Sequence, residues 1–284
     1  MSIPVIHRLY NDFVISDKPN RQYSLTFDGS KSNSGNCIIP VKNRREVELL
    51  LLSLGDEASV IMDEQTRERY PDVWGWLAGR VYTEILNNLK WSYHEVEEVL
   101  DIIERIPLPK ALGDSFLKLQ NDDPEPERID PEYVHKRNKE NVLISKPYTC
   151  GNMFYFNGFQ ESPEFIIDHG SDHLDGIIIF EIARQAGIAS THLTGVPLYG
   201  TIVLIKAIIQ YKNFVELNSS HIICTIPVIR VRGGYFYVAF NIRQSDNSCA
   251  TGYLAGFLYK NKESYQKHRN LKRISEASNE KIVK

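Results

Sequence analysis

Two histidines and several aspartates lie together in the loop 168–176, so this segment is rich in groups that exchange protons or bind metals. Histidine changes charge near neutral pH, so His169 or His173 could act as a general acid or base. Histidine and carboxylate are also good metal ligands, but the spacing of the two histidines matches no zinc signature. We therefore expect proton transfer and no metal at this loop.

The segment after the loop predicts a buried helix with one polar patch. Residues 177–189 are apolar except for Glu181, Arg184, Gln185 and the small Gly187. Spacings of three and four residues place side chains on one face of a helix, so this carboxylate, guanidinium and amide should meet. A helix that is apolar all round is buried. An ionised group there must be paired or must line a site.

The polar patch has two interpretations. Glu181 could be a carboxylate in an apolar pocket, with its protonation state tuned by Arg184, and so belong to an active site. Alternatively, the patch is a buried structural pair that fixes the orientation of the helix. We favour the catalytic interpretation, because apolar residues would fix a helix at lower cost.

Composition excludes several classes of function. The 284 residues are 42% hydrophobic and 24% charged, as in ordinary globular proteins of one large or two medium domains. The net charge of −3 gives no electrostatic case for nucleic acid or an anionic membrane. No apolar run approaches the ~20 residues of a membrane span, and no glycine-rich phosphate loop is present. The four cysteines lack CxxC spacing and the first residues do not resemble a signal peptide, so we expect a cytoplasmic protein with reduced thiols. We also expect no cofactor.

The first 119 residues predict short strands followed by helices. The strand candidates, which are rich in β-branched and aromatic residues, are 4–10, 13–15, 22–27 and 37–41. The helix candidates are 43–54 ending at Gly55, 72–89 after Pro71, and 93–106 with Ser92 and Glu95 as a capping box. The stretch 120–131 is rich in proline and acidic residues and predicts an exposed linker.

The second half of the sequence predicts a sheet that surrounds the helix. Its strand candidates are 141–145 and 152–159 before the helix, and 199–211, 220–231, 235–243 and 250–259 after it. A buried helix followed by a four-stranded antiparallel meander is an α+β arrangement. We therefore expect an N-terminal region (1–119), a linker (120–131), a sheet-and-helix domain (132–260) and a basic tail (261–284).

Residues 133–260 resemble the A-factor biosynthesis hotdog (AfsA-like) family of γ-butyrolactone signalling. The matching segments are VHKRNKENVLIS (134–145), DHGSDHLDG (168–176), EIARQAGIASTH (181–192) and GVP (195–197). The resemblance implies a hotdog fold, an antiparallel sheet wrapped round a long central helix, which pairs with a second hotdog. Family members usually carry two such repeats. This chain has one complete copy, and a short similarity between 6–16 and 134–145 suggests a degenerate first repeat in the N-terminal region.

The resemblance also implies an activity, the transfer of a β-ketoacyl group from an acyl carrier protein thioester to the hydroxyl of dihydroxyacetone phosphate. Glu181 would act as base or orienting group, and Arg184 would neutralise it or hold phosphate. Backbone N–H groups near Gly176 would bind the thioester oxygen, with Gln185 as a further substrate-binding residue. His169 or His173 would help to move protons.

Two alternatives stay open at this point. A hotdog dehydratase or thioesterase would act on thioesters of acyl carrier protein or coenzyme A through a loop histidine and a helix acid. A non-catalytic acyl-binding subunit would use Glu181 and Arg184 for structure. In each case we expect a homodimer through the hotdog domain, and neither a nucleic-acid partner nor a membrane span.

Overall fold

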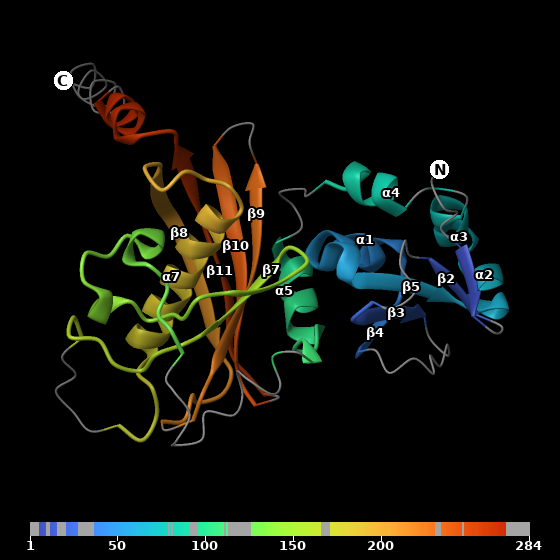
Figure 1. Ribbon diagram of the computed structural model, residues 1–284, viewed down its shortest axis with the longest axis horizontal. Helices are drawn as coiled ribbons and strands as arrows, with labels where there is room; N and C mark the ends of the chain where they lie inside the picture. Colours follow the sequence, from blue (N-terminus) through green and yellow to red (C-terminus); the bar gives the residue numbers. More distant parts are fainter. Residues whose placement is uncertain are drawn as a thin grey trace, which may run out of the picture.

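The computed structural model describes most of the chain. The described residues are 6–9, 12–15, 21–27, 37–78, 80, 82–90, 96–110, 112, 126–165, 171–217, 219–230, 234–245 and 247–270. They form an N-terminal region built on a five-stranded sheet and a C-terminal domain built on a six-stranded sheet (Figure 1).

The N-terminal region is a mixed sheet flanked by short helices. Its elements are β1 (Ile6–Leu9), β2 (Asp12–Ile15), β3 (Tyr23–Phe27), β4 (Cys37–Val41), α1 (Arg44–Leu54), η1 (Gly55–Glu57), β5 (Ala58–Met62), α2 (Glu64–Arg69), α3 (Pro71–Leu77), α4 (Tyr82–Asn88) and α5 (Val96–Arg105). The four predicted strands and the helix that ends at Gly55 are confirmed. Asn43 caps α1 by accepting the N–H of Glu46, and Gly55 ends it with a φ of 56°.

One prediction for this region was wrong, and two of its elements were not predicted. The helix predicted over 72–89 is divided into α3 and α4, because the backbone at Ala78 is extended (ψ 136°). The buried strand β5 and the helix α2 were not predicted; β5 has no alternation of polar and apolar residues because every one of its residues is buried. The predicted capping box at Ser92 and Glu95 lies outside the described residues.

The sheet of the N-terminal region does not have the topology of a hotdog. Its strand order is β1-β2-β5-β3-β4, and β3 pairs in parallel with both β4 and β5. The sheet of the C-terminal domain is antiparallel at each pairing described. The short sequence similarity that suggested a degenerate first repeat is therefore not accompanied by a shared topology among the described strands.

The C-terminal domain is an antiparallel sheet wrapped around one long helix, as expected for a hotdog. Its elements are η3 (Pro131–Val134), η4 (Lys139–Asn141), β6 (Tyr148–Cys150), β7 (Met153–Asn157), α7 (Gly176–Leu193), β8 (Thr201–Tyr211), β9 (Ile222–Arg230), β10 (Tyr235–Gln244) and β11 (Asn247–Tyr259). Figure 1 shows α7 lying along one face of this sheet. Residues 262–270 form a further helix. None of the helices in the described part of the chain could cross a membrane.

Three details of this domain differ from the predictions. The strand order is β6-β7-β9-β10-β11-β8, so β8 pairs with β11 at the edge and the predicted four-stranded meander was wrong. Residues 141–145 make isolated bridges through Ile144 and Ser145 rather than a strand. The predicted linker 120–131 was wrong at its described end, because Ile129 is buried and its N–H donates to the carbonyl of Ile144.

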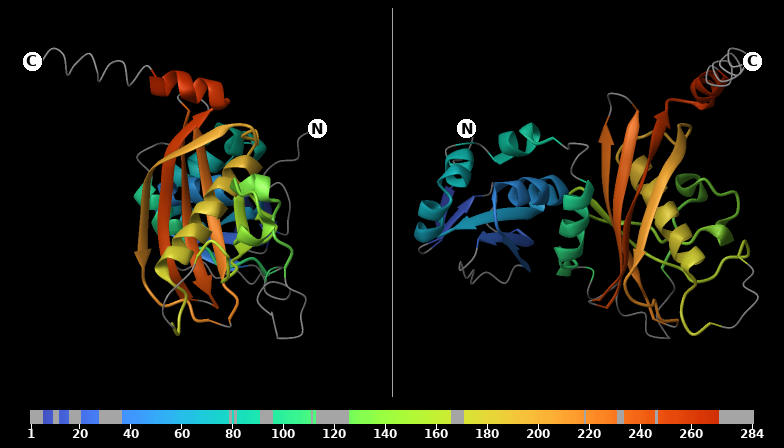
Figure 2. Two further views of the ribbon diagram at one scale, coloured as in Figure 1. Left: turned by 90° about the vertical axis from the view of Figure 1, so that its left-hand side faces the viewer. Right: turned by 180° about the vertical axis from the view of Figure 1, so that it is seen from behind.

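The two faces of the hotdog sheet pack against different partners. One face contacts α7, whose apolar side chains Ile182, Ala183 and Ala186 are fully buried in the core of the domain. The other face contacts α5, whose Val99 and Ile103 belong to a core that continues into the N-terminal region. Figure 2 shows the sheet standing between α7 and α5. The N-terminal region and the hotdog therefore share a core.

The backbones of the two regions approach closely at Gly151, in the turn between β6 and β7. Its φ is 59°, and an added Cβ would lie 2.1 Å from the carbonyl oxygen of Leu54. We predict that Gly151→Ala destabilises the chain by roughly 2–4 kcal/mol, from steric overlap and backbone strain together. Urea denaturation measures this. Gly75→Ala is the matched control, because nothing lies within 4 Å of its Cβ; equal effects of the two substitutions would contradict the prediction.

Candidate functional site

The predicted site residues that belong to α7 lie on two opposite faces of the helix. Gly176 and Ile179 line a pocket at the N-terminal end of the helix. Glu181 follows Ile179 by two residues, and therefore points about 200° away around the helix axis. The structure thus separates Glu181, Arg184 and Gln185 from the pocket, and the predicted single site becomes two groups of residues.

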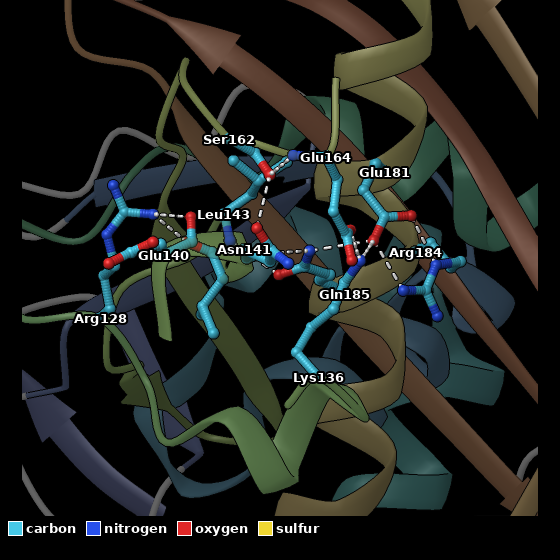
Figure 3. Close-up of polar contacts among 11 residues, drawn as sticks. Arg128, Lys136, Glu140, Asn141, Leu143, Ser162, Glu164, Glu181, Arg184 and Gln185 are labelled. Atoms are coloured by element: carbon cyan, nitrogen blue, oxygen red, sulfur yellow. Dashed lines mark hydrogen bonds and ion pairs between the residues drawn. The ribbon is translucent and has the colours of Figure 1, made fainter. Parts of the chain in front are cut away.

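The first group is a network of charged and amide side chains centred on Glu181 (Figure 3). Arg184 Nε and Nη2 donate to the two carboxylate oxygens of Glu181 at 2.6 and 2.7 Å. Gln185 Nε2 donates to Glu181 Oε1 at 3.0 Å, and Lys136 Nζ lies 3.1 Å from the same oxygen. The predicted contact between the three polar residues of α7 is therefore confirmed, and Lys136 joins it from a segment that sequence reasoning did not connect to the site.

Hydrogen bonds of the network join α7 to residues 141–143, in the segment before the sheet. The side chain of Gln185 is fully buried; its Oε1 accepts the N–H of Leu143 at 2.7 Å, and its Nε2 donates to the carbonyl of Asn141 at 2.9 Å. Lys136 also pairs with Glu164. Each of these bonds joins α7 or Lys136 to a residue that is distant in sequence, so the network fixes the position of the helix.

The electrostatics of Glu181 keep its carboxyl group ionised at neutral pH. Burial raises the pKa of this carboxyl group, but hydrogen bonds and charge from Arg184, with further bonds from Gln185 and Lys136, lower the pKa to about 2. A carboxylate with so low a pKa is a weak base at neutral pH. The geometry therefore favours Glu181 as a residue that positions α7.

The second group lines a pocket of about 350 Å³ at the start of α7. Its lining is mostly apolar, with a few polar side chains, and consists of His173, Leu174, Gly176, Ile179, Tyr211, Lys212, Asn213, Phe214 and Val215. Concave apolar sites of this size with a few polar groups are typical of small-molecule sites. The pocket forms because the end of β8 lies beside the start of α7.

Histidine and aromatic side chains define the mouth of this pocket. His173 Nδ1 lies 2.7 Å from Asp172 Oδ1, and the His173 ring packs against Phe214 with centroids 4.5 Å apart. The Tyr211 hydroxyl donates to the carbonyl of Gly176 at 2.8 Å. Tyr211 and Phe214 were not predicted as site residues, because nothing in their local sequence places the end of a strand against a helix 35 residues earlier.

His169 lies outside the described residues. Within the part of the chain that the structure describes, no three histidine, cysteine or acidic side chains are grouped as metal ligands.

The last turn of α7 carries a buried histidine, His192, which contacts the exposed His135 of the segment before the sheet. His192 Nε2 and His135 Nε2 are 2.9 Å apart, and His192 Nδ1 lies 2.9 Å from the carbonyl of Val196. Burial lowers the pKa of His192, and partial loss of solvent together with the nearby charges of His192 and Arg184 lowers the pKa of His135. The pair joins three segments of the sequence that resemble the A-factor family, namely 134–145, 181–192 and 195–197, so these segments are adjacent in the structure.

The sequence around this site matches the model of a known protein family. The model described as the A-factor biosynthesis hotdog domain matches residues 117–260, just over half of the chain. This chain belongs to the A-factor biosynthesis hotdog family. The match covers the whole sheet around α7, the pocket at its start and the network of Glu181, so both groups of residues lie in the family domain.

Several solved structures are similar to this family member at low identity. The uncharacterised protein PH1136 from Pyrococcus horikoshii is 14% identical, with 46% of this chain and 92% of that chain covered and a TM-score of 0.34. A mutant of thioesterase PA1618 from Pseudomonas aeruginosa is 10% identical (41% and 81% covered, TM-score 0.33). The protein smu.793 from Streptococcus mutans, bound to acetyl CoA, is 16% identical (44% and 95% covered, TM-score 0.34). No curated protein matches the sequence.

Proposed function

We propose that this member of the A-factor hotdog family transfers a β-ketoacyl group from a thioester to a hydroxyl, in the pocket at the start of α7. The observation that supports this most strongly is the pocket itself. It combines an apolar wall for an acyl chain with a helix N-terminus and a histidine at its mouth. The membership of the family makes a triose phosphate such as dihydroxyacetone phosphate the natural acceptor and an acyl carrier protein the natural donor, with coenzyme A as the other carrier.

The N-terminal end of α7 supplies the electrostatic part of the proposed reaction. The N–H groups of Ile178 and Ile179 donate to the carbonyl of Asp175, so the N–H groups of Gly176 and Ile177 point out of the helix end. N–H groups at a helix start stabilise a developing negative charge. They would receive the thioester carbonyl oxygen as it becomes an oxyanion.

His173 supplies the proton transfer. The acceptor hydroxyl oxygen attacks the thioester carbonyl carbon while the imidazole takes the hydroxyl proton, and the C–S bond of the tetrahedral intermediate then breaks. The proton passes from His173 to the departing thiolate, so the products are an ester and a thiol. Asp172, paired with His173 Nδ1, orients the ring and stabilises its charged form.

Glu181, Arg184 and Gln185 serve this reaction indirectly. Their bonds to Lys136, Asn141 and Leu143 fix the position of α7 relative to the segment before the sheet. The N–H groups at the start of the helix are thereby held in place as well. We therefore propose a positioning role for Glu181, in place of the role of base that the sequence suggested.

The products formed from a β-ketoacyl carrier protein test the proposed function. Incubation with and without dihydroxyacetone phosphate, followed by mass spectrometry, separates the possible reactions. The proposal expects the phosphorylated ester, or the butenolide formed from it, in the sample that contains the acceptor. Free acid or an enoyl product at the same rate without the acceptor would overturn transfer and indicate a thioesterase or dehydratase. No turnover in either sample would indicate an acyl-binding subunit.

The edge of the hotdog sheet supports the proposal that the chain forms a homodimer. β8 is the last strand of the six-stranded sheet, so one side of its backbone is unpaired within that sheet. Exposed apolar side chains follow it, with Leu204 38% and Ile205 57% exposed, and Tyr211 at its end lines the pocket. An apolar strand edge pairs readily with another copy of itself. A second copy at β8 would lie beside the mouth of the pocket.

We predict that Ile205→Lys weakens this dimer by at least about tenfold, because the charge would be buried against the apolar face of the partner. Sedimentation equilibrium over a range of concentrations measures the dissociation constant. Ile38→Lys is the matched control, because Ile38 is 42% exposed on an edge strand of the other sheet. The same dissociation constant for both variants, or a monomeric parent protein, would contradict pairing through β8.

A further inference from the structure

We propose that the N-terminal region holds a second binding site, in a pocket among α1, α3 and α4, for a small organic phosphate. The inference goes beyond the proposed acyl transfer and stands independently of it. It rests on the shape of the pocket, on its excess of positive charge and on its apolar floor.

The pocket has a volume of about 280 Å³, which suits a small metabolite. Three helices and the residues after two of them contribute its lining, which consists of Arg44, Arg45, Glu48, Leu52, Trp76, Arg80, Ile85, Asn88, Leu89 and Lys90. Figure 1 shows these helices on the side of the hotdog sheet opposite to α7. The pocket is therefore separate from the candidate active site.

Positive charge exceeds negative charge in this pocket. Four cationic side chains and one carboxylate line it, a net charge of +3 in a chain whose net charge is −3. Glu48 pairs with Arg44 at 2.8 Å and with Arg45 at 3.4 Å, and Arg45 also pairs with Glu98, outside the lining, at 3.2 Å. Within the described part of the chain, neither Arg80 nor Lys90 has an ion-pair partner. These two side chains can therefore bind an anion without giving up an existing bond.

The floor of the pocket is apolar and aromatic. Leu52 and Ile85 are buried beneath it, and Trp76 is 9% exposed. The Arg44 guanidinium lies over the Trp76 ring, 4.6 Å from its centroid, so the ring also orients one of the cations. Arginine binds phosphate oxygens in a bidentate manner, and an aromatic floor suits an apolar or ring-shaped body. A phosphate ester matches both parts of the pocket better than a bare anion does.

Calorimetric titration of the full chain with phenyl phosphate, inorganic phosphate and phenol tests this site. We expect saturable binding of phenyl phosphate, weaker binding of inorganic phosphate and none of phenol. The Arg80→Gln/Lys90→Gln double variant should lose at least about tenfold in affinity for phenyl phosphate. Both residues are exposed, so the fold should persist, and an unchanged melting temperature checks that.

Lys262→Gln/Lys267→Gln is the matched control, because it removes the same number of charges from the exposed helix 262–270. It should bind phenyl phosphate as the parent does. The proposal is overturned by equal affinity in the two double variants, or by the absence of saturable binding to the parent. Acyl transfer is measured in a separate experiment. The absence of phenyl phosphate binding would therefore not contradict the proposed acyl transfer, and the absence of acyl transfer would not contradict phosphate binding.

Discussion

Glu181→Gln is expected to destabilise the folded chain by about 3 kcal/mol at pH 7 and by far less near pH 2. The Glu181 pKa falls from 4.5 to about 2 on folding, and each unit corresponds to ~1.4 kcal/mol. Because the folded pKa is the lower one, the stabilisation is complete above pH 4.5 and disappears as the pH falls towards 2. The substitution also leaves the half-buried charge of Arg184 without its anionic partner, while Lys136 keeps its ion pair with Glu164.

Urea denaturation of the parent and the variant at several pH values measures this effect. At each pH, the free energy of unfolding of the variant is subtracted from that of the parent. The contribution of other titrating groups cancels in this difference, because both proteins share those groups. Glu97→Gln, on the exposed side of α5, is the control and should change stability by less than about 0.5 kcal/mol. If the difference in free energy of unfolding between the parent and Glu181→Gln stays the same from pH 7 to pH 3, the charge of Glu181 does not stabilise the fold.

His173→Gln is expected to lower the rate of acyl transfer by about 10²–10⁴-fold, the usual contribution of a general base. The His173 side chain is 39% exposed, so the substitution should leave the free energy of unfolding nearly unchanged. Steady-state kinetics with the β-ketoacyl thioester and the acceptor give the ratio of rates. His268→Gln in the helix 262–270 is the matched control and should keep the parent rate.

The two variants together distinguish a catalytic from a positioning residue. Where Glu181→Gln is folded, it should keep transfer within about tenfold of the parent, because its carboxylate faces away from the pocket. The opposite result, with a normal rate for His173→Gln and a rate lowered about 1,000-fold for folded Glu181→Gln, would return the role of base to Glu181.

The sequence predicted best the features that depend on residues close together in the chain. The apolar run with its polar triad predicted both α7 and the contact of Glu181 with Arg184 and Gln185, because helical spacing alone brings them together. Of the predicted meander, the antiparallel pairing of β9 with β10 and of β10 with β11 is confirmed, because these strands follow one another in the chain. Such features depend on neighbours in sequence.

The parts that the sequence could not predict depend on contacts between distant segments. The position of β8 at the sheet edge, and hence Tyr211 beside Gly176, is set by its pairing with β11. The direction of Glu181 is set by Lys136 and by the bonds of Gln185 to the segment before the sheet. The burial cost of Glu181 therefore identified the residue but not its role, since a buried carboxylate looks the same in sequence whether it reacts or holds a helix.

A crystal structure with a non-hydrolysable β-ketoacyl pantetheine amide would test the central claim most directly. The account predicts the acyl chain in the pocket at the start of α7, with the carbonyl oxygen within hydrogen-bond distance of the N–H of Gly176 or Ile177. It also predicts the imidazole of His173 beside the carbonyl carbon. Binding of the amide against Glu181 and Arg184, with the pocket at the start of α7 unfilled, would contradict it.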